Sequence, residues 1–271
     1  MTERFTPADL EGQAIGPVDV AVTADRVAFY VDATGDDAAR WIDLAPPGFG
    51  SVLLFAAADE FLYDRRVLPF TRTLLHLDQS FTYIDAIRAG STLTVSGTVA
   101  RVRVRAGSYF VTFTAVASDG NHRVMESKST FVLSDQQAPP VDAAADEPPV
   151  RARAKSSGAE RSASRHDLVR YSAATRDFNP LHWDHEFALD AGLPGTVVHG
   201  LLMYAWLMQE ASAAAGGRDV ESAKIRFRSA LLPAEQASIS ASVDGDSVKL
   251  DLTRDGEQLI TGTATVTTPT E

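Results

Sequence analysis

Two segments that are apolar on nearly every face place the strongest constraint on how this chain can fold. Residues 51–63 (SVLLFAAADEFLY) follow Gly50, and residues 201–215 (LLMYAWLMQEASAAA) follow Gly200. A helix that is apolar all round is buried on most of its surface. No apolar stretch approaches the roughly 20 residues of a membrane-spanning helix. We therefore expect both segments to be helices enclosed by the protein itself.

Each apolar segment is followed by four stretches with the apolar–polar alternation of half-buried strands. The first set comprises residues 74–83, 91–105, 109–117 and 124–132, and the second comprises residues 223–231, 237–243, 248–253 and 259–266. Asp-Gly pairs at 244–245 and 255–256 are typical of tight hairpin turns. A central helix wrapped by an antiparallel sheet is an α+β unit, and the pattern predicts two such units, each with its own sheet.

A weak internal repeat supports this two-unit organisation. Residues 24–37 have helical periodicity after the N-cap residue Thr23, and residues 165–178 have it after Ser164, which starts an S-x-x-D capping box. At an offset of 141 the coinciding residues are Tyr30 and Tyr171, Thr34 and Thr175, and Asp36 and Asp177. Two related units predict a pseudo-symmetric dimer within one chain.

The two units are separated by a stretch of different composition. Residues 134–163 are rich in proline, alanine, serine and charge, with almost no large apolar side chain. Such a stretch cannot bury enough surface to offset the entropy lost on ordering, so we predict a linker. The expected division is an N-terminal domain at 1–133, the linker at 134–163 and a C-terminal domain at 164–271.

The overall composition limits the classes of function that the chain can have. The net charge is −11, whereas nucleic-acid binding requires a basic surface, so we expect no nucleic-acid partner. The absence of cysteine excludes disulfides, thiolate metal sites and a cysteine nucleophile, and it fits a reducing cytoplasm. The first residues, MTERFTPADLEG, lack the apolar core of a signal peptide, so a cytoplasmic protein is expected.

The densest cluster of functional side chains follows the second helical stretch. Asp177, Asn179 and His182 lie within six residues, and Asn179 precedes a proline, which pushes it out of the α region and predicts a turn. Asp184 is expected to cap a short helix at 185–191. A carboxylate, a carboxamide and an imidazole on so tight a loop can converge on one water molecule and move its protons.

Gly200 stands at the start of the second apolar helix. The first amides of a helix have no internal partner and lie at the positive end of its dipole. A glycine lets a ligand oxygen approach the backbone N–H, so this position can stabilise an oxygen that becomes negative during a reaction. Further along the helix, we expect Tyr204 and Met208 to line an apolar substrate pocket.

The segment RYSAATRDFNPLHWDHEFALDAGLPGTVVHGLLMYA resembles the signature of MaoC-like hydratases, in which D-x-N-P-x-H is followed by G-L-P-G and H-G. The resemblance implies a hot-dog fold and an (R)-specific enoyl thioester hydratase or 3-hydroxyacyl thioester dehydratase of acyl-CoA or fatty acid metabolism. It also implies that Asp177, Asn179 and His182 hold the catalytic water and that the Gly200 N–H binds the thioester oxygen. Arg176 and Leu201 depart from the usual glycine and methionine, and Arg176 can reshape the loop.

The first half resembles, more loosely, the degenerate partner domain of double hot-dog members, through QSFTYIDAIRAGSTLTVSGTV. At the same offset, Ala38 and Trp41 take the places of the asparagine and histidine, so only Asp36 of the trio is kept. The resemblance implies one active site per chain, with room for the acyl tail in the first half. It implies no cofactor beyond the CoA or phosphopantetheine arm of the acyl thioester substrate, and a homodimer is one expected assembly.

Several alternatives compete with this interpretation. His182, Asp184 and His185 suggest a metal site, but capping explains the aspartate and we expect no metal. His199 is expected to hold the loop before the apolar helix. A hot-dog thioesterase shares the fold but usually carries its carboxylate on the central helix, where the sequence offers only Glu210. A non-catalytic acyl-thioester-binding subunit would not need a buried carboxylate and imidazole, which are costly to keep.

Overall fold

The computed structural model describes residues 5–136 and 159–268, and most of the expected linker, residues 137–158, lies outside the described residues. The first half contains η1 (Pro7–Leu10), β1 (Ala14–Ala21), α1 (Ala24–Thr34), η2 (Pro47–Phe49), α2 (Gly50–Leu62), η3 (Leu68–Phe70), β2 (Thr73–Tyr83), β3 (Thr92–Arg105), β4 (Ser108–Asp119) and β5 (His122–Ser134). The second half contains β6 (Glu160–Arg161), α3 (Arg165–Thr175), η4 (Pro180–His182), α4 (His185–Asp190), α5 (Gly200–Ala214), β7 (Val220–Phe227), β8 (Ala237–Asp244), β9 (Ser247–Arg254) and β10 (Glu257–Val266).

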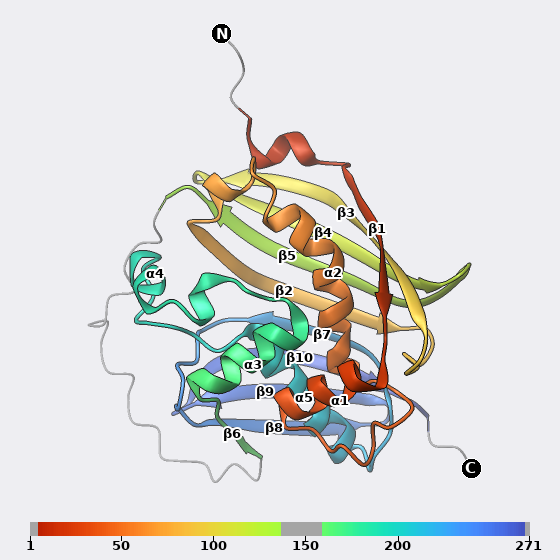
Figure 1. Ribbon diagram of the computed structural model, residues 1–271. Helices are drawn as coiled ribbons and strands as arrows, with labels where there is room; N and C mark the ends of the chain where they lie inside the picture. Colours follow the sequence, from red (N-terminus) through yellow and green to blue (C-terminus); the bar gives the residue numbers. More distant parts are fainter. Residues whose placement is uncertain (1–4, 137–158, 269–271) are drawn as a thin grey trace.

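Both apolar segments are central helices, as predicted. In α2 ten of thirteen residues are buried, and in α5 ten of fifteen are buried. Helix α2 packs on β1, β3, β4 and β5, whereas α5 packs on β7, β8, β9 and β10. Figure 1 shows the two helices lying along the two halves of the sheet, on the same side of it. The core therefore forms between each helix and its own strands.

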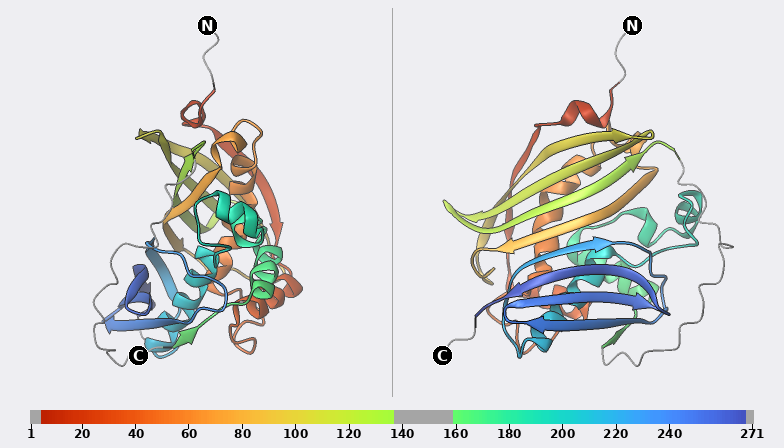
Figure 2. Two further views of the ribbon diagram at one scale, coloured as in Figure 1. Left: turned by 90° about the vertical axis from the view of Figure 1, so that its left-hand side faces the viewer. Right: turned by 180° about the vertical axis from the view of Figure 1, so that it is seen from behind.

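The strands form one sheet and not the two separate sheets that we expected. Its order is β1-β3-β4-β5-β2-β7-β10-β9-β8-β6, and neighbouring strands run antiparallel. The join is the pairing of β2 with β7, from Asp78 opposite Arg226 to Thr82 opposite Ser222. Figure 2 shows the strands of the two halves continuing side by side across this join. Pairing hides the backbone groups of two edges that would otherwise be exposed.

Local capping explains how the helices that carry the loops begin and end. Thr23 Oγ1 accepts the Arg26 N–H at the start of α1, and Ser164 forms the predicted capping box at the start of α3. Both helices end three residues earlier than predicted, at Thr34 and Thr175. The reason is that the next residue of each adopts the left-handed conformation that ends a helix, with φ of 64° at Gly35 and 70° at Arg176.

Two strands were absent from the sequence-based prediction. Strand β1 contains Pro17, and its register on β3 shifts between Ile15 and Val18. A proline and a bulge break the alternation by which a strand is recognised. Strand β6 has only two residues and lies in the stretch expected to be linker. In the part of the chain that the structure describes, no helix is long and apolar enough to cross a membrane.

The two halves meet through their loop-bearing helices. Helix α1 packs against α3, and the fully buried rings of Tyr30 and Tyr171 lie 6.1 Å apart across this contact. The threonines four residues later, Thr34 and Thr175, each donate their hydroxyl to the carbonyl of the tyrosine. The repeat at an offset of 141 is therefore a real structural correspondence. It brings the loop after each helix to the interface between the halves.

Candidate active site

The loop after α3 carries a buried carboxylate whose position is held by local hydrogen bonds. Asp177 is only 9% exposed. Its N–H donates to Thr175 Oγ1 at 3.2 Å, and its Oδ1 accepts the Asn179 N–H at 3.4 Å. Asn179 Oδ1 then accepts the Leu181 N–H, which starts the 3-10 turn η4. The D-x-N-P-x-H motif thus folds as the compact loop that its turn signals predict.

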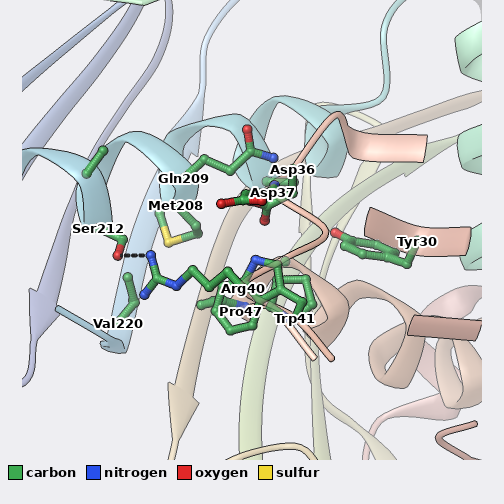
Figure 3. A pocket seen from close by; sticks show the side chains of 14 residues that line it. Tyr30, Asp36, Asp37, Arg40, Trp41, Pro47, Met208, Gln209, Ser212 and Val220 are labelled. Atoms are coloured by element: carbon green, nitrogen blue, oxygen red, sulfur yellow. Dashed lines mark hydrogen bonds between the residues drawn. The ribbon is translucent and has the colours of Figure 1, made fainter. Parts of the chain in front are cut away.

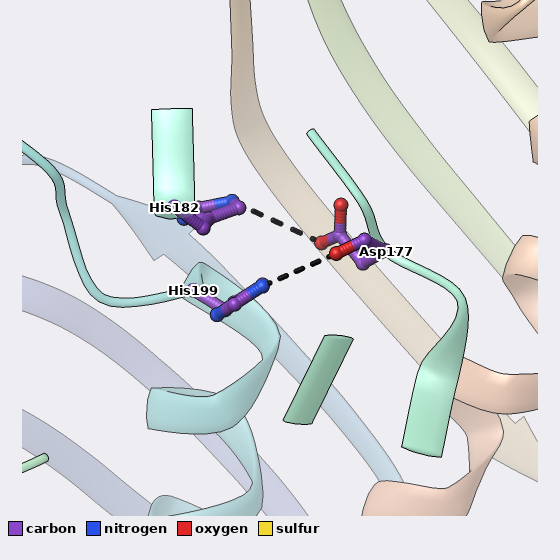
Figure 4. Close-up of side chains that lie close together, drawn as sticks. All are labelled: Asp177, His182 and His199. Carbon is purple, nitrogen blue, oxygen red and sulfur yellow. Dashed lines mark hydrogen bonds and ion pairs between the residues drawn. The ribbon is translucent and has the colours of Figure 1, made fainter. Parts of the chain in front are cut away.

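His182 faces this carboxylate across a short gap. Its Nδ1 lies 2.8 Å from the carbonyl oxygen of Val197, which can only accept a hydrogen bond, so Nδ1 carries the proton. The lone pair of Nε2 consequently points toward Asp177, with 4.0 Å between Nε2 and Oδ2 (Figure 4). This distance is too long for a direct hydrogen bond but lets one water molecule contact both atoms.

Burial shifts the pKa values of the two groups in opposite directions. It raises the pKa of Asp177 to about 7, and the hydrogen bond from Asn179 opposes this rise. It lowers the pKa of His182 to about 4, and the Val197 carbonyl opposes this fall. Burial disfavours the charged form of each group, so at mildly acidic to neutral pH the pair holds a single proton and no net charge. In this state the carboxyl of Asp177 can donate a proton while Nε2 of His182 accepts one.

His199 lies beneath this pair and fits the structural role expected for it. Its Nε2 lies 3.0 Å from Ser172 Oγ and 3.3 Å from the backbone oxygen of Asp177. Its ring stacks on that of His182, with centroids 3.7 Å apart and 22° between the planes. Burial, followed by the neighbouring His182, holds the pKa of His199 well below its usual range. A neutral, buried imidazole therefore supports both the loop and the facing ring.

One group of possible metal ligands is found among the described residues. It consists of Asp177, His182 and His199, whose ligand atoms lie within 4.8 Å of one another. A bound transition metal lies about 2 Å from each nitrogen, in the plane of each ring. Two nearly parallel rings stacked 3.7 Å apart cannot both satisfy this condition at one ion. Asp184, from the set considered in the sequence, instead caps α4 through the Phe187 N–H. The arrangement fits proton transfer better than metal binding.

Gly200 is the first residue of α5 and directly follows His199. Within the described residues its N–H has no hydrogen-bond acceptor, as expected for the first turn of a helix. A Cβ atom at this position would come within 2.7 Å of the Phe227 ring. The glycine therefore allows β7 to pack closely on the helix start while it leaves a backbone donor free.

Tyr204 and Met208, the two residues of α5 expected to line the substrate pocket, have different surroundings. Tyr204 is fully buried, and its hydroxyl lies 3.0 Å from that of Tyr83. Met208 instead lines a cavity of about 190 Å³ around the loop of the first half, with Asp36 and Trp41 (Figure 3). The role of Tyr204 and Met208 in lining the substrate pocket stays a prediction.

The loop of the first half lacks the arrangement seen around Asp177. Asp36 is half-buried, and burial raises its pKa. The nearby cation Arg40 is already bound by Ser212 Oγ at 2.6 Å and Asp219 at 3.0 Å. No imidazole faces Asp36 from its own loop, since Trp41 takes that place in the sequence. Of the two corresponding loops, only the one after α3 thus brings a carboxylate and an imidazole together.

Asp59 lies on α2 next to the Asp177 loop and was not among the residues predicted for the site. Its Oδ2 is 3.6 Å from Nε of Arg176, the residue before Asp177. The sequence offers only Glu210 on the central helix of the same half. The signal was available, because a pseudo-symmetric pair places the helix of one half against the loop of the other.

Comparisons with known proteins agree with this architecture. Residues 145–269 match the family described as MaoC like domain, and residues 9–127 match the FAS1-like, dehydratase domain region. A UPF0336 protein of Streptomyces griseus is 38% identical over 84 residues, which span 30% of this chain and 55% of that protein. The mitochondrial 3-hydroxyacyl-[acyl-carrier-protein] dehydratase of Arabidopsis thaliana is 36% identical over 66 residues, 24% of this chain and 40% of that protein. The chain thus spans about half the length of these curated relatives.

Solved structures resemble the whole chain. A MaoC-like dehydratase superposes with a TM-score of 0.75 at 22% identity and covers 96% of this chain and 99% of its own. A Mycobacterium tuberculosis protein described as a double hotdog fold superposes with a TM-score of 0.62 at 13% identity, covering 95% and 96%. At these identities the likeness establishes the fold. Together with the two family matches, it identifies the chain as MaoC-like: a MaoC-like domain in the C-terminal half and a FAS1-like dehydratase region in the N-terminal half form a double hot-dog fold.

Proposed function

We propose that the chain reversibly hydrates (2E)-enoyl thioesters to (3R)-3-hydroxyacyl thioesters, using Asp177 and His182 as its acid–base pair. The observation that carries the proposal is the pair itself, a buried carboxyl and a buried imidazole separated by 4.0 Å with opposite pKa shifts. Groups whose surroundings push their pKa values apart are typical of acid–base catalysis near neutral pH. The (3R) configuration rests on the family resemblance.

Hydration breaks one O–H bond of water, forms a bond from its oxygen to C3 and delivers one proton to C2. The free lone pair on Nε2 of His182 takes the proton from water, and the carboxyl of Asp177 supplies the proton to C2. A proton then passes from the imidazolium to the carboxylate, which restores the starting pair. Dehydration follows the same steps in reverse, since the pair holds one proton in either direction. Asn179 keeps the loop closed so that both groups face the same water.

Addition of water at C3 places negative charge on the thioester oxygen before C2 is protonated. The free N–H of Gly200, at the positive end of α5, lies at the end of the same loop and is suited to bind that oxygen. The thioester class is supported by the relative named as a 3-hydroxyacyl-[acyl-carrier-protein] dehydratase. Either CoA or a carrier protein could present the acyl group with this chemistry.

The test uses the purified chain with crotonyl-CoA, a longer enoyl-CoA and the matching enoyl-carrier-protein substrates. We expect loss of the enoyl absorbance without release of free thiol, and a (3R)-hydroxyacyl product on chiral chromatography. His182→Ala should abolish the reaction, while Asp36→Asn in the other loop serves as the matched control. Unchanged absorbance with every substrate would exclude the proposal.

Thioester hydrolysis is the second candidate, because Asp59 does place a carboxylate of a central helix beside the Asp177 loop. Hydrolysis would release free thiol and leave the enoyl double bond intact. The same assay therefore separates the two reactions, since a thiol reagent and the enoyl absorbance can be followed in parallel.

A further inference from the structure

Asp59 is a carboxylate that the first half contributes to the surroundings of the second half's loop. Its side chain is 17% exposed, and its Oδ1 is buried without a hydrogen-bond partner among the described residues. Its Oδ2 lies 3.6 Å from Nε of Arg176. A buried carboxylate oxygen without a partner is costly to keep for packing alone. Its position therefore calls for a function.

Arg176 is the link between Asp59 and the catalytic loop. It directly precedes Asp177 and has a φ of 70°, which residues other than glycine and asparagine adopt at a cost of about 1 kcal/mol. This conformation ends α3 and turns the chain so that Asp177 points inward. An ion pair to α2 fixes the side chain of a residue whose backbone is under strain.

The charged and titratable groups around Asp59 form one connected set. Burial, followed by the charge of Asp177, raises the pKa of Asp59 to about 7, and Arg176 opposes both effects. Burial, followed by the charges of Asp177 and Asp59, also raises the pKa of the Tyr63 hydroxyl. Burial lowers the pKa of Arg26 on α1, and the positive charge of Arg176 lowers it as well. Interaction between two carboxyl groups is reciprocal, so ionised Asp59 disfavours ionised Asp177.

We propose that Asp59 is a positioning residue for the catalytic loop, supplied by the half that lacks the chemistry and acting through Arg176. The proposal rests on the hydratase function proposed above. It gives the first half a second task beside enclosing the substrate: its central helix fixes the start of the loop and keeps a second carboxylate beside the reacting pair. Arg176, which stands where the family usually has glycine, then has a role of its own as the ion-pair partner of Asp59.

The test compares Asp59→Asn with Glu60→Gln, a neighbouring solvent-exposed carboxylate on the same helix. Asp59→Asn removes a negative charge beside Asp177, so the alkaline limb of the kcat/KM profile should move to lower pH. We expect kcat at pH 7 to fall about two- to five-fold, the range of an ion pair whose arginine is largely exposed, with little change in KM. Arg176→Asn, which tolerates the left-handed conformation, should cause a similar loss. The double variant should lose no more than either single variant, because one interaction is removed in each case.

A second readout does not depend on turnover. Hydrogen exchange should speed up at the amides of Asp177, Asn179 and His182 in Asp59→Asn, and the carboxyl carbon of Asp177 should titrate at lower pH by NMR. Glu60→Gln should change neither quantity. If Asp59→Asn matches Glu60→Gln in exchange and titration, the positioning role is wrong even if the wild type hydrates enoyl thioesters. If the wild type is inactive while exchange and titration shift as expected, the hydratase proposal fails and the loop-positioning role stands.

Discussion

Gly200→Ala tests the backbone donor at the start of α5. The added Cβ would lie 2.7, 3.0 and 3.1 Å from three atoms of the Phe227 ring, whereas ordinary carbon contacts lie at about 3.5–4.0 Å. The helix start or the ring must therefore move by about 0.8 Å. His76 also packs against that ring, with centroids 4.9 Å apart, and restricts its movement, so part of the displacement should fall on the helix.

The expected loss follows from this displacement. A donor to a developing oxyanion is effective at about 2.7–3.1 Å, and misplacement by about 1 Å can reduce turnover about 100-fold. We predict that kcat for enoyl-CoA hydration falls by about that factor while KM changes little, because the contact strengthens in the transition state. Overpacking should also lower the free energy of unfolding by about 1–3 kcal/mol, measured by denaturant titration.

A second substitution separates this explanation from general damage. Phe227→Ala removes the ring that the new Cβ meets. The double variant Gly200→Ala/Phe227→Ala should therefore have a kcat close to that of Phe227→Ala alone, which means that most of the loss caused by Gly200→Ala is recovered. A kcat within twofold of wild type for Gly200→Ala would refute the role of this amide. A 100-fold loss that the second substitution leaves unchanged would refute the steric reasoning.

Four further predictions follow from the site. His182→Ala should reduce kcat/KM by at least about 100-fold, whereas Asp36→Asn should stay within twofold, and equal losses would contradict a single active site. The kcat/KM profile should be bell-shaped, because His182 gains a proton below a pKa of about 4 and Asp177 loses one above about 7; a rise in activity above pH 8 would contradict this. Dialysis against a strong chelator should leave activity unchanged, given the stacked histidines, and restoration by added zinc would overturn that inference. Ser164→Ala should lower the free energy of unfolding by about 1 kcal/mol through loss of the α3 cap, as thermal unfolding would measure.

The sequence was sufficient to predict the elements that depend on local chemistry. Thr23 and Ser164 mark helix starts because a side-chain oxygen satisfies an otherwise free amide, whatever the rest of the fold. The apolar helices and the eight long strands follow from periodicity, which reports burial directly. The loop from Asp177 to His182 is also local, since its turn is set by Asn179 and the proline after it.

The features that were missed depend on how the two halves meet. The β2–β7 pairing that joins the sheets is a contact between strands about 145 residues apart, and no local pattern encodes it. Asp59 was overlooked because only the central helix of the same half was considered for the Asp177 loop. The end of α3 was predicted too late because nothing in the sequence marks Arg176 as left-handed, whereas at α1 the glycine at position 35 was a signal that the helical periodicity overrode.

The most direct test of the central claim is proton NMR of enoyl-CoA hydration in deuterium oxide. The account predicts a 3-hydroxyacyl-CoA with the oxygen on C3 and one deuterium on C2, because the proton on Asp177 exchanges with solvent before it is delivered. Asp177→Asn, which keeps the shape of the side chain but cannot supply that proton, should form no product on the same timescale. Free CoA with an intact enoyl group, or undiminished hydration by Asp177→Asn, would contradict the account.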